Sequence, residues 1–139
     1  MNYVILISHG QYAQGLHDAL NMFVGEREDV LSIGLAKGED VASLAKRIME
    51  IIAPFEQSDE FLVLADLIGG SPLTTLMNCL EEKQLLAQTS ILGGMNLAMA
   101  LNAIIMKDSD MQTAKDTAIK EGLEAIKELA LTKDEEEDI

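Results

Sequence analysis

The sequence has no tryptophan and only one cysteine, Cys79. A single cysteine cannot form an internal disulfide, and no second cysteine creates a metal-binding spacing. We therefore interpret Cys79 as a small buried thiol in a reducing compartment. No apolar run approaches the roughly 20 residues that a membrane-spanning helix requires. The N-terminus also lacks the basic segment and the small-residue cleavage site of a signal peptide, so we expect a cytoplasmic protein.

Basic residues are also scarce, because 10 lysines and arginines stand against 24 acidic residues and give a net charge of −14. A chain of this charge repels nucleic acid and anionic membranes, and it attracts basic protein partners. With 139 residues, 48% of them apolar, the chain is long enough to bury a real core in one domain. We expect that domain over residues 1–131, followed by a frayed acidic tail over 132–139.

The apolar residues alternate between short strand-like runs and helical patterns. Strands are expected over 3–7, 30–34, 61–65 and 85–92, and helices over 11–24, 39–52, from Ser71 onward, 95–106 and 110–131. In the third helix, Ser71 is expected at the N-cap and Pro72 at the first helical position. This order predicts an α/β protein with an open, doubly wound, mostly parallel sheet of flavodoxin-like type and strand order 2-1-3-4.

Three polar segments follow the expected strands: Ser8-His9-Gly10, the run from Asp66 to Pro72, and Gly93-Gly94-Met95-Asn96. In a doubly wound sheet, functional sites lie at the carboxyl ends of the strands. The first and third strands are neighbours in the order 2-1-3-4, and neighbouring strands lie about 4.8 Å apart. We therefore expect His9 and Asp66 to meet, although they are far apart in the sequence.

A carboxylate beside an imidazole has a defined chemical effect. It accepts a hydrogen bond from one ring nitrogen of His9 and leaves the other nitrogen with a free lone pair. That lone pair can take a proton, a metal or a phosphoryl group. A metal would need further ligands that the sequence does not bring together. A phosphoryl group fits better, because Gly69 and Gly70 let backbone amides approach, Ser71 supplies a hydroxyl, and the helix that follows adds its positive end.

Each of these residues also has an ordinary structural interpretation. A lone histidine at a strand end is usually a surface or capping residue, and an aspartate before two glycines usually belongs to a turn. Their joint occurrence at one expected edge favours a functional site. His17 has no comparable neighbours and is interpreted as a helix-surface residue. The eight methionines are interpreted as core filler.

Ser8-His9-Gly10 together with the segment from Phe61 to Pro72 resembles the EIIA components of the mannose-family bacterial phosphotransferase system, over essentially the whole chain to about residue 131. The second motif, D-x-x-G-G-S-P after a strand, is the more specific one. The resemblance implies that His9 accepts a phosphoryl group from phospho-HPr and passes it to an EIIB component, with Asp66 orienting the ring. It implies no metal, nucleotide or other cofactor.

The resemblance further implies a homodimer, which in some relatives contains an exchanged edge strand, and an indirect link to the EIIC and EIID membrane components. Sugar specificity resides in those components, so the sequence does not name the sugar. Leu97 follows Asn96 where family members often have a proline, which leaves the role of the loop from Gly93 to Asn96 open. The chain ends after its acidic tail, so we expect a stand-alone EIIA.

The same residues allow other readings, one within the same fold and the others from different classes. The phosphotransferase subunit of dihydroxyacetone kinase has a similar first motif but lacks the Gly-Gly-Ser-Pro form. A receiver-like signalling domain would be phosphorylated on Asp66, but it needs an acidic pair after the first strand to hold magnesium, where this chain has Ser8-His9. A flavin-binding module is disfavoured, because this chain has no tryptophan and few aromatic residues to stack on the flavin ring. A purely structural interaction protein would not need His9 and Asp66 to converge.

Overall fold

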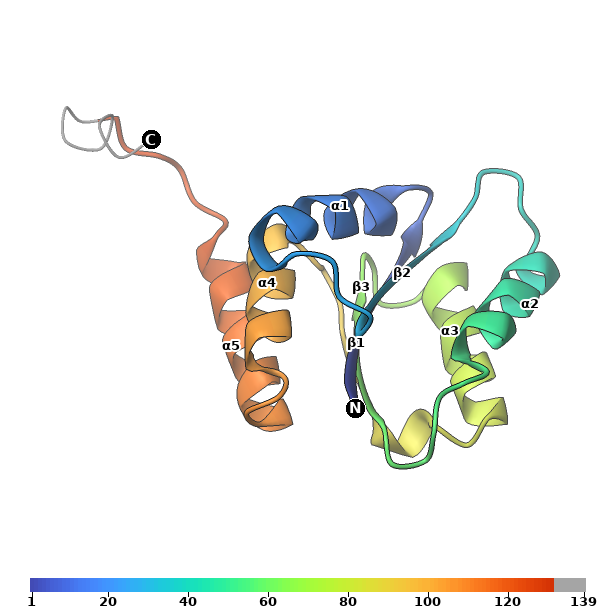
Figure 1. Ribbon diagram of the computed structural model, residues 1–139. Coiled ribbons are helices and arrows are strands. Elements are labelled where there is room, and N and C mark those ends of the chain that lie inside the picture. Colours follow the sequence, from blue (N-terminus) through green and yellow to red (C-terminus); the bar gives the residue numbers. More distant parts are fainter. Residues whose placement is uncertain (132–139) are drawn as a thin grey trace.

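A four-stranded parallel sheet with helices on both faces forms the centre of the protein (Figure 1). The computed structural model describes residues 1–131, so the expected acidic tail lies outside the described residues. The strands are β1 (Asn2–His9), β2 (Val30–Leu35), β3 (Glu60–Ala65) and β4 (Thr89–Leu92). Their order is β2-β1-β3-β4, which confirms the order predicted from the sequence.

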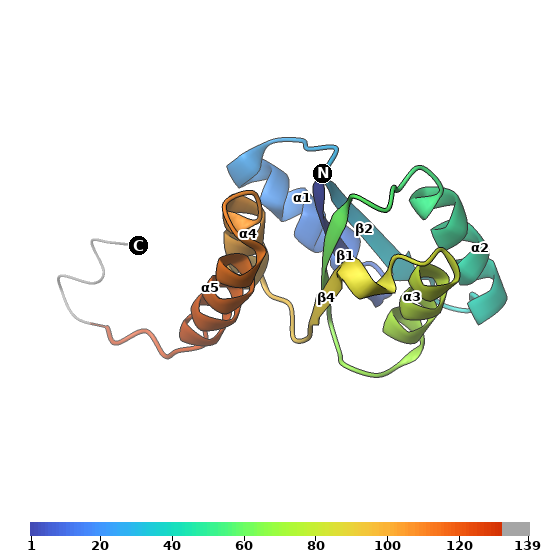
Figure 2. The ribbon, with the colours of Figure 1, turned by 90° about the horizontal axis from the view of Figure 1, so that it is seen from below.

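In the described part of the chain, five α-helices cover the sheet: α1 (Tyr12–Val24), α2 (Val41–Ile52), α3 (Ser71–Glu82), α4 (Leu97–Met106) and α5 (Met111–Glu124). Helices α2 and α3 lie on one face, and α1, α4 and α5 lie on the other (Figures 1 and 2). This arrangement is the doubly wound fold expected from alternating strands and helices.

The two central strands supply the core on both faces. In β1, Val4 and Leu6 pack with α1, α4 and α5, whereas Ile5 and Ile7 pack with α2 and α3. Successive side chains of a strand point to opposite faces, so a strand buried on both sides needs a continuous apolar run. Ile7 pairs with Ala65 in the parallel register, so the carboxyl ends of β1 and β3 lie side by side at the same edge of the sheet.

Several element boundaries differ from the expected ones. Ser71 is already helical and Gly70 is the N-cap, with a positive φ of 85° that glycine adopts readily, so the expectation of Ser71 as N-cap was wrong. Strand β4 begins only at Thr89, because residues 86–88 form a short 3₁₀ turn, η1 (Leu86–Gln88). Helix α5 ends at Glu124 instead of residue 131, because the apolar residues beyond it are exposed and have no core to pack against.

The burial of Cys79 agrees with the expectation, whereas that of His17 and of some methionines differs from it. The thiol of Cys79 is buried as expected, and burial raises its pKa. His17 is half-buried rather than on the surface, because its Nδ1 lies 2.7 Å from Oγ of Ser32 on β2. Among the methionines, Met95 is buried, but Met22 is 86% exposed and therefore fills no core.

A buried lysine closes the end of the molecule opposite the carboxyl edge of the sheet. The side chain of Lys107, which follows α4, is fully buried, and its Nζ lies 2.7 Å from Oδ2 of Asp29 and 3.0 Å from Oδ1 of Asp108. Arg27 also binds Asp29 at 2.8 Å. The hydrogen bond from Arg27, joined by that from Lys107, outweighs partial burial and holds the pKa of the Asp29 carboxyl well below its usual range. The cluster therefore joins the start of β2 to the end of α4.

We expect Asp29→Asn to lower the free energy of unfolding by about 2–4 kcal/mol at pH 7, since leaving a buried charge without its partner costs about 3–5 kcal/mol and Asp108 still binds Lys107. The pKa of Asp29 is depressed in the folded state. The stability that Asp29 contributes is therefore fully present above its unfolded-state pKa of about 4, and it is lost as the pH falls through the lower folded-state pKa. Urea denaturation at pH 7 and pH 3 measures both effects. Asp108→Asn, at a side chain 61% exposed, is the control with a small expected change. Equal losses for both variants would contradict the prediction.

Candidate functional site

His9 and Asp66 meet at the carboxyl edge of the sheet, at the ends of β1 and β3. Oδ2 of Asp66 lies 2.9 Å from the backbone nitrogen of His9 and 2.8 Å from its Nδ1. Oδ1 of the same carboxylate accepts a hydrogen bond of 2.8 Å from the N–H of Leu67. The convergence predicted from the strand order is therefore present, and it fixes both the backbone and the ring of His9.

The carboxylate of Asp66 is held in its ionised form. Partial burial alone would raise its pKa, but the hydrogen bonds from the backbone and ring of His9 and from Leu67 outweigh it and hold the pKa below its usual range. An ionised carboxylate only accepts hydrogen bonds, so Nδ1 of His9 must donate. In the neutral ring, Nε2 then carries the free lone pair. The imidazole is 49% exposed, which leaves that nitrogen open to a reactant.

Gly70 lies against the edge of the ring that carries Nε2. A β-carbon added at Gly70 would lie 3.2 Å from Cε1 and 3.5 Å from Nε2 of His9. Gly69 has the same positive φ of 85° and open space around it. Helix α3 begins at the exposed Ser71, and no side chain among residues 1–131 caps its first turn. Of the predicted segment Gly69-Gly70-Ser71, the structure shows Gly70 beside the free side of the imidazole. Gly70 is the N-cap of α3, whose first-turn N–H groups are of the kind that bind anions.

Two further residues build the site and were not singled out from the sequence. The buried Oγ of Ser8 accepts a 2.7 Å hydrogen bond from the N–H of Ala13, so the residue before His9 caps the first turn of α1. The usual N-cap pattern does not reveal this contact, because an N-cap side chain accepts from the N–H two or three positions later, whereas Ser8 lies five positions before Ala13. The hydroxyl of Tyr12 donates a 2.6 Å hydrogen bond to the carbonyl of Met95. This contact joins the start of α1 to the third polar segment.

Exposed apolar side chains lie on the segments that hold His9. Tyr12, Leu67 and Ile68 are 47%, 60% and 69% exposed, although all three belong to the segments that hold His9. Ile68 also fills the space above Gly93, where an added β-carbon would lie 2.4 Å from Cγ1 of Ile68. The loops after β3 and β4 are therefore packed together beside the site.

Two negative findings apply to the part of the chain that the structure describes. Within residues 1–131, no three histidine, cysteine or acidic side chains are grouped so that they could hold a metal ion. No helix in the same range has the length and apolar character needed to cross a membrane.

Comparison with known proteins places these residues in a family. Residues 3–121 match the family model EIIA-man, described as "PTS system fructose IIA component". The fructose-specific EIIA component of Bacillus subtilis (strain 168) is 24% identical over 105 residues, which cover 76% of this chain and 70% of that protein. The mannose-specific EIIAB component of Escherichia coli (strain K12) is 25% identical over 129 residues, which cover 89% of this chain but only 39% of that longer protein.

Solved structures agree with the sequence comparison. The mannose/sorbose specific IIA subunit from Enterococcus faecalis superimposes with a TM-score of 0.79 at 25% identity, over 95% of this chain and 97% of the other. The EIIA component from Streptococcus agalactiae gives a TM-score of 0.77 at 25% identity, over 92% and 97% of the two chains. The family model matches residues 3–121, which include His9, Asp66 and the elements that hold them. This chain therefore belongs to the mannose-type EIIA family and is a phosphoryl-transfer component of the sugar phosphotransferase system.

Proposed function

We propose that the protein carries a phosphoryl group on Nε2 of His9, which it accepts from phospho-HPr and passes to an EIIB component. The observation that supports this proposal is the contact between Nδ1 and Asp66, which leaves Nε2 as the free and accessible nucleophile. The phosphoryl group would then reach the sugar during its uptake through the EIIC and EIID membrane components. Exchange with HPr would take place in the cytoplasm.

The transfer is a displacement at phosphorus. The lone pair on Nε2 of His9 forms the new N–P bond while the N–P bond of the donor phosphohistidine breaks, and its electron pair returns to the donor ring. The proton on Nδ1 stays in place, so the phosphorylated ring carries a positive charge that the carboxylate of Asp66 offsets. Both bonds are of the same kind, so the step is near-balanced and reversible, and it requires mainly positioning and anion stabilisation. No metal or cofactor takes part in the proposed step.

Backbone donors at the start of α3 are proposed to hold the phosphoryl oxygens. The uncapped first turn offers N–H groups at the positive end of the helix, and the contact of Gly70 with the ring edge puts this turn beside Nε2. We assign Gly69, Gly70 and the hydroxyl of Ser71 to this role. A side chain at Gly70 would stand against the ring in the path of the phosphoryl group.

Both partners are proposed to dock on the face around His9. Each must bring a histidine to Nε2, so each must cover the exposed apolar side chains of Tyr12, Leu67 and Ile68. The net charge of −14 favours donors and acceptors with a basic surface and steers their approach. The family match and the EIIA relatives favour this function over the dihydroxyacetone kinase subunit considered from the sequence. The receiver alternative is disfavoured, because both oxygens of Asp66 already accept hydrogen bonds.

Incubation with phosphoenolpyruvate, enzyme I and HPr should add one phosphoryl group to the protein. The adduct should be labile in acid and stable in base, as expected of a phosphoramidate, and peptide mass spectrometry should locate it on His9. His9→Ala should abolish the labelling, and His17→Ala, at the second histidine, is the matched control that should retain it. Undiminished labelling of His9→Ala would refute the assignment, and a phosphoryl group on Asp66 would favour the receiver alternative.

Asp66→Asn should leave the fold intact and slow phosphoryl transfer by about 10- to 1,000-fold. The amide can present its NH₂ group to the ring, which selects the wrong tautomer and removes the free lone pair from Nε2. The corresponding change in a serine protease triad costs about 10⁴ in rate, and phosphoryl transfer moves fewer protons, so a smaller loss is expected. The measurement is the single-turnover rate of transfer from phospho-HPr at fixed salt, with the exposed Asp18→Asn as control. A rate within about twofold of wild type would make Asp66 a turn residue only.

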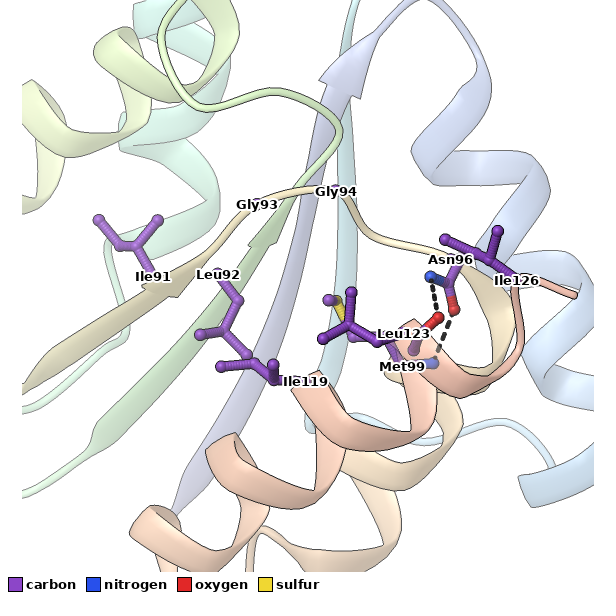
Figure 3. A pocket seen from close by; sticks show the side chains of 10 residues that line it. Ile91, Leu92, Gly93, Gly94, Asn96, Met99, Ile119, Leu123 and Ile126 are labelled. Carbon is purple, nitrogen blue, oxygen red and sulfur yellow. Dashed lines mark hydrogen bonds between the residues drawn. The ribbon is translucent and has the colours of Figure 1, made fainter.

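We also propose that the protein forms a homodimer across the β4 edge. Within residues 1–131, strand β4 pairs only with β3 and leaves its other edge open. Beside it lies an apolar cavity of about 450 Å³ between β4 and the end of α5, lined among others by Leu92, Ile119 and Leu123 (Figure 3). Ile126, at the mouth of this cavity, is 77% exposed. An open strand edge next to an apolar surface is a common place for a second copy to bind.

Light scattering at micromolar concentration should give twice the mass of the single chain. Leu123→Asp should lower this mass to that of the monomer without loss of folding, because the Leu123 side chain is 66% exposed in the single chain. Met22→Asp, at a side chain 86% exposed on α1, is the matched control and should leave the mass unchanged. A monomer mass for the wild-type protein would refute the dimer.

A further inference from the structure

We propose that Gly34 is a positioning residue for His9, because the turn that carries the histidine rests in the space that a side chain at Gly34 would fill. We further propose that Arg47 holds Gly34 in place from helix α2. The consequence for transfer rests on the proposed function, whereas the consequence for the geometry of the ring does not.

The turn after β1 is attached to the end of β2. Ser8 is paired with Gly34 and His9 with Leu35 in the parallel register. The N–H of Gly10 then donates a 2.8 Å hydrogen bond to the carbonyl of Leu35. The backbone on both sides of His9 is therefore supported by the last two residues of β2, while Asp66 holds the ring from the opposite neighbour, β3.

Position 34 requires a glycine because there is no room for a β-carbon, and not because of its backbone conformation. Its φ lies outside the left-handed region, so any residue could adopt its backbone angles. An added β-carbon, however, would lie 2.0 Å from the carbonyl oxygen of Gly10 and 2.7 and 2.8 Å from Oε1 and Nε2 of Gln14. The amide of Gln14 ends a flexible side chain and can move away. The oxygen of Gly10 is backbone, so it can move only if the turn beside His9 moves.

Arg47 fixes Gly34 from the outer edge of the sheet. Strand β2 is an edge strand, and Nη2 of Arg47 donates a 2.7 Å hydrogen bond to the carbonyl of Gly34. The same guanidinium binds Glu39 through Nε at 2.9 Å and Nη2 at 2.8 Å, and Glu39 also accepts a hydrogen bond from the N–H of Ala36. The hydrogen bond from Arg47, followed by that from Ala36, lowers the pKa of Glu39 to about 2, so Glu39 and Arg47 both stay charged at neutral pH. Arg47 is thereby held rigidly against β2.

A side chain at position 34 would therefore affect phosphoryl transfer by displacing the turn that carries His9. The oxygen of Gly10 has to retreat by about 1 Å before the contact reaches the 3.0 Å below which real β-carbons are essentially not found. His9 is the residue directly before Gly10, and both of its hydrogen bonds to Asp66 depend on its present position. A misplacement of about 1 Å at a reacting group can cost about 100-fold in rate.

The first test is Gly34→Ala, measured in two ways. The single-turnover rate of transfer from phospho-HPr should fall by about 10- to 100-fold. The ¹⁵N chemical shifts of the His9 ring in the unphosphorylated protein should show a changed tautomer population, which a merely destabilising substitution would not produce in the folded protein. Gly15→Ala, at an α1 position with nothing within 4 Å of an added β-carbon, should change neither readout.

A second substitution separates the two groups that the new β-carbon would meet. In the Gly34→Ala background, Gln14→Ala removes the flexible amide but leaves the carbonyl of Gly10 in place. We expect no recovery of rate or tautomer. Full recovery would assign the effect to Gln14 and overturn the role of the turn.

Arg47→Met tests the same support without adding an atom beside the turn, and so keeps the proposal testable if Gly34→Ala does not fold. Loss of the hydrogen bond to Gly34 should slow transfer severalfold and shift the ring signals in the same direction, and Arg47→Lys should recover part of both. If Gly34→Ala folds and shows wild-type rates and ring signals, the proposal is overturned. If Gly34→Ala does not fold, wild-type rates and ring signals in Arg47→Met overturn it instead. If phospho-HPr fails to label wild-type His9, the proposed function fails, and the ring signals still decide whether Gly34 positions the histidine.

Discussion

The carboxylate of Asp66 is the contact on which the site depends. One of its oxygens accepts hydrogen bonds from both the backbone and the ring of His9, so it sets the place of the residue and the orientation of the imidazole together. This is possible only because β1 and β3 are adjacent and parallel, with their carboxyl ends at one edge. A shift of one residue in their register would turn Asp66 to the opposite face of the sheet.

The remainder of the fold keeps that edge rigid. The central strands are buried on both faces by two apolar clusters, so β1 and β3 cannot move apart without exposing both clusters. The buried ion pair of Lys107 and Asp29 closes the opposite end of the sheet. The buried ion pair and the candidate site thus lie at opposite ends of the sheet. At the carboxyl edge, glycines and uncapped backbone N–H groups remain available to an anion.

Local patterns were misleading where tertiary contacts outweigh them. Ser71 looks like an N-cap before Pro72, but Gly70 takes that position, where its positive φ and the nearby ring of His9 both favour a residue without a β-carbon. The helical pattern beyond Glu124 continues in sequence without a packed face in the described chain, and helices of this kind depend on packing for their stability. Lys107 stands in a polar stretch, yet it is buried because Asp29 and Asp108 supply two carboxylates for its ammonium group.

The sequence by itself determined the strand order, the doubly wound fold and the meeting of His9 with Asp66. The doubly wound fold follows from apolar periodicity and from the right-handed connection of parallel strands, which are local or general properties of the chain. The strand order and the meeting of His9 with Asp66 follow once the sheet is taken to be of flavodoxin-like type. Only the tertiary structure decided that Gly34 lies under the carbonyl of Gly10, or that the hydroxyl of Tyr12 reaches the carbonyl of Met95. These contacts join segments that are distant in sequence or on different elements. They depend on backbone positions to within about an ångström, and no residue pattern encodes a position that finely.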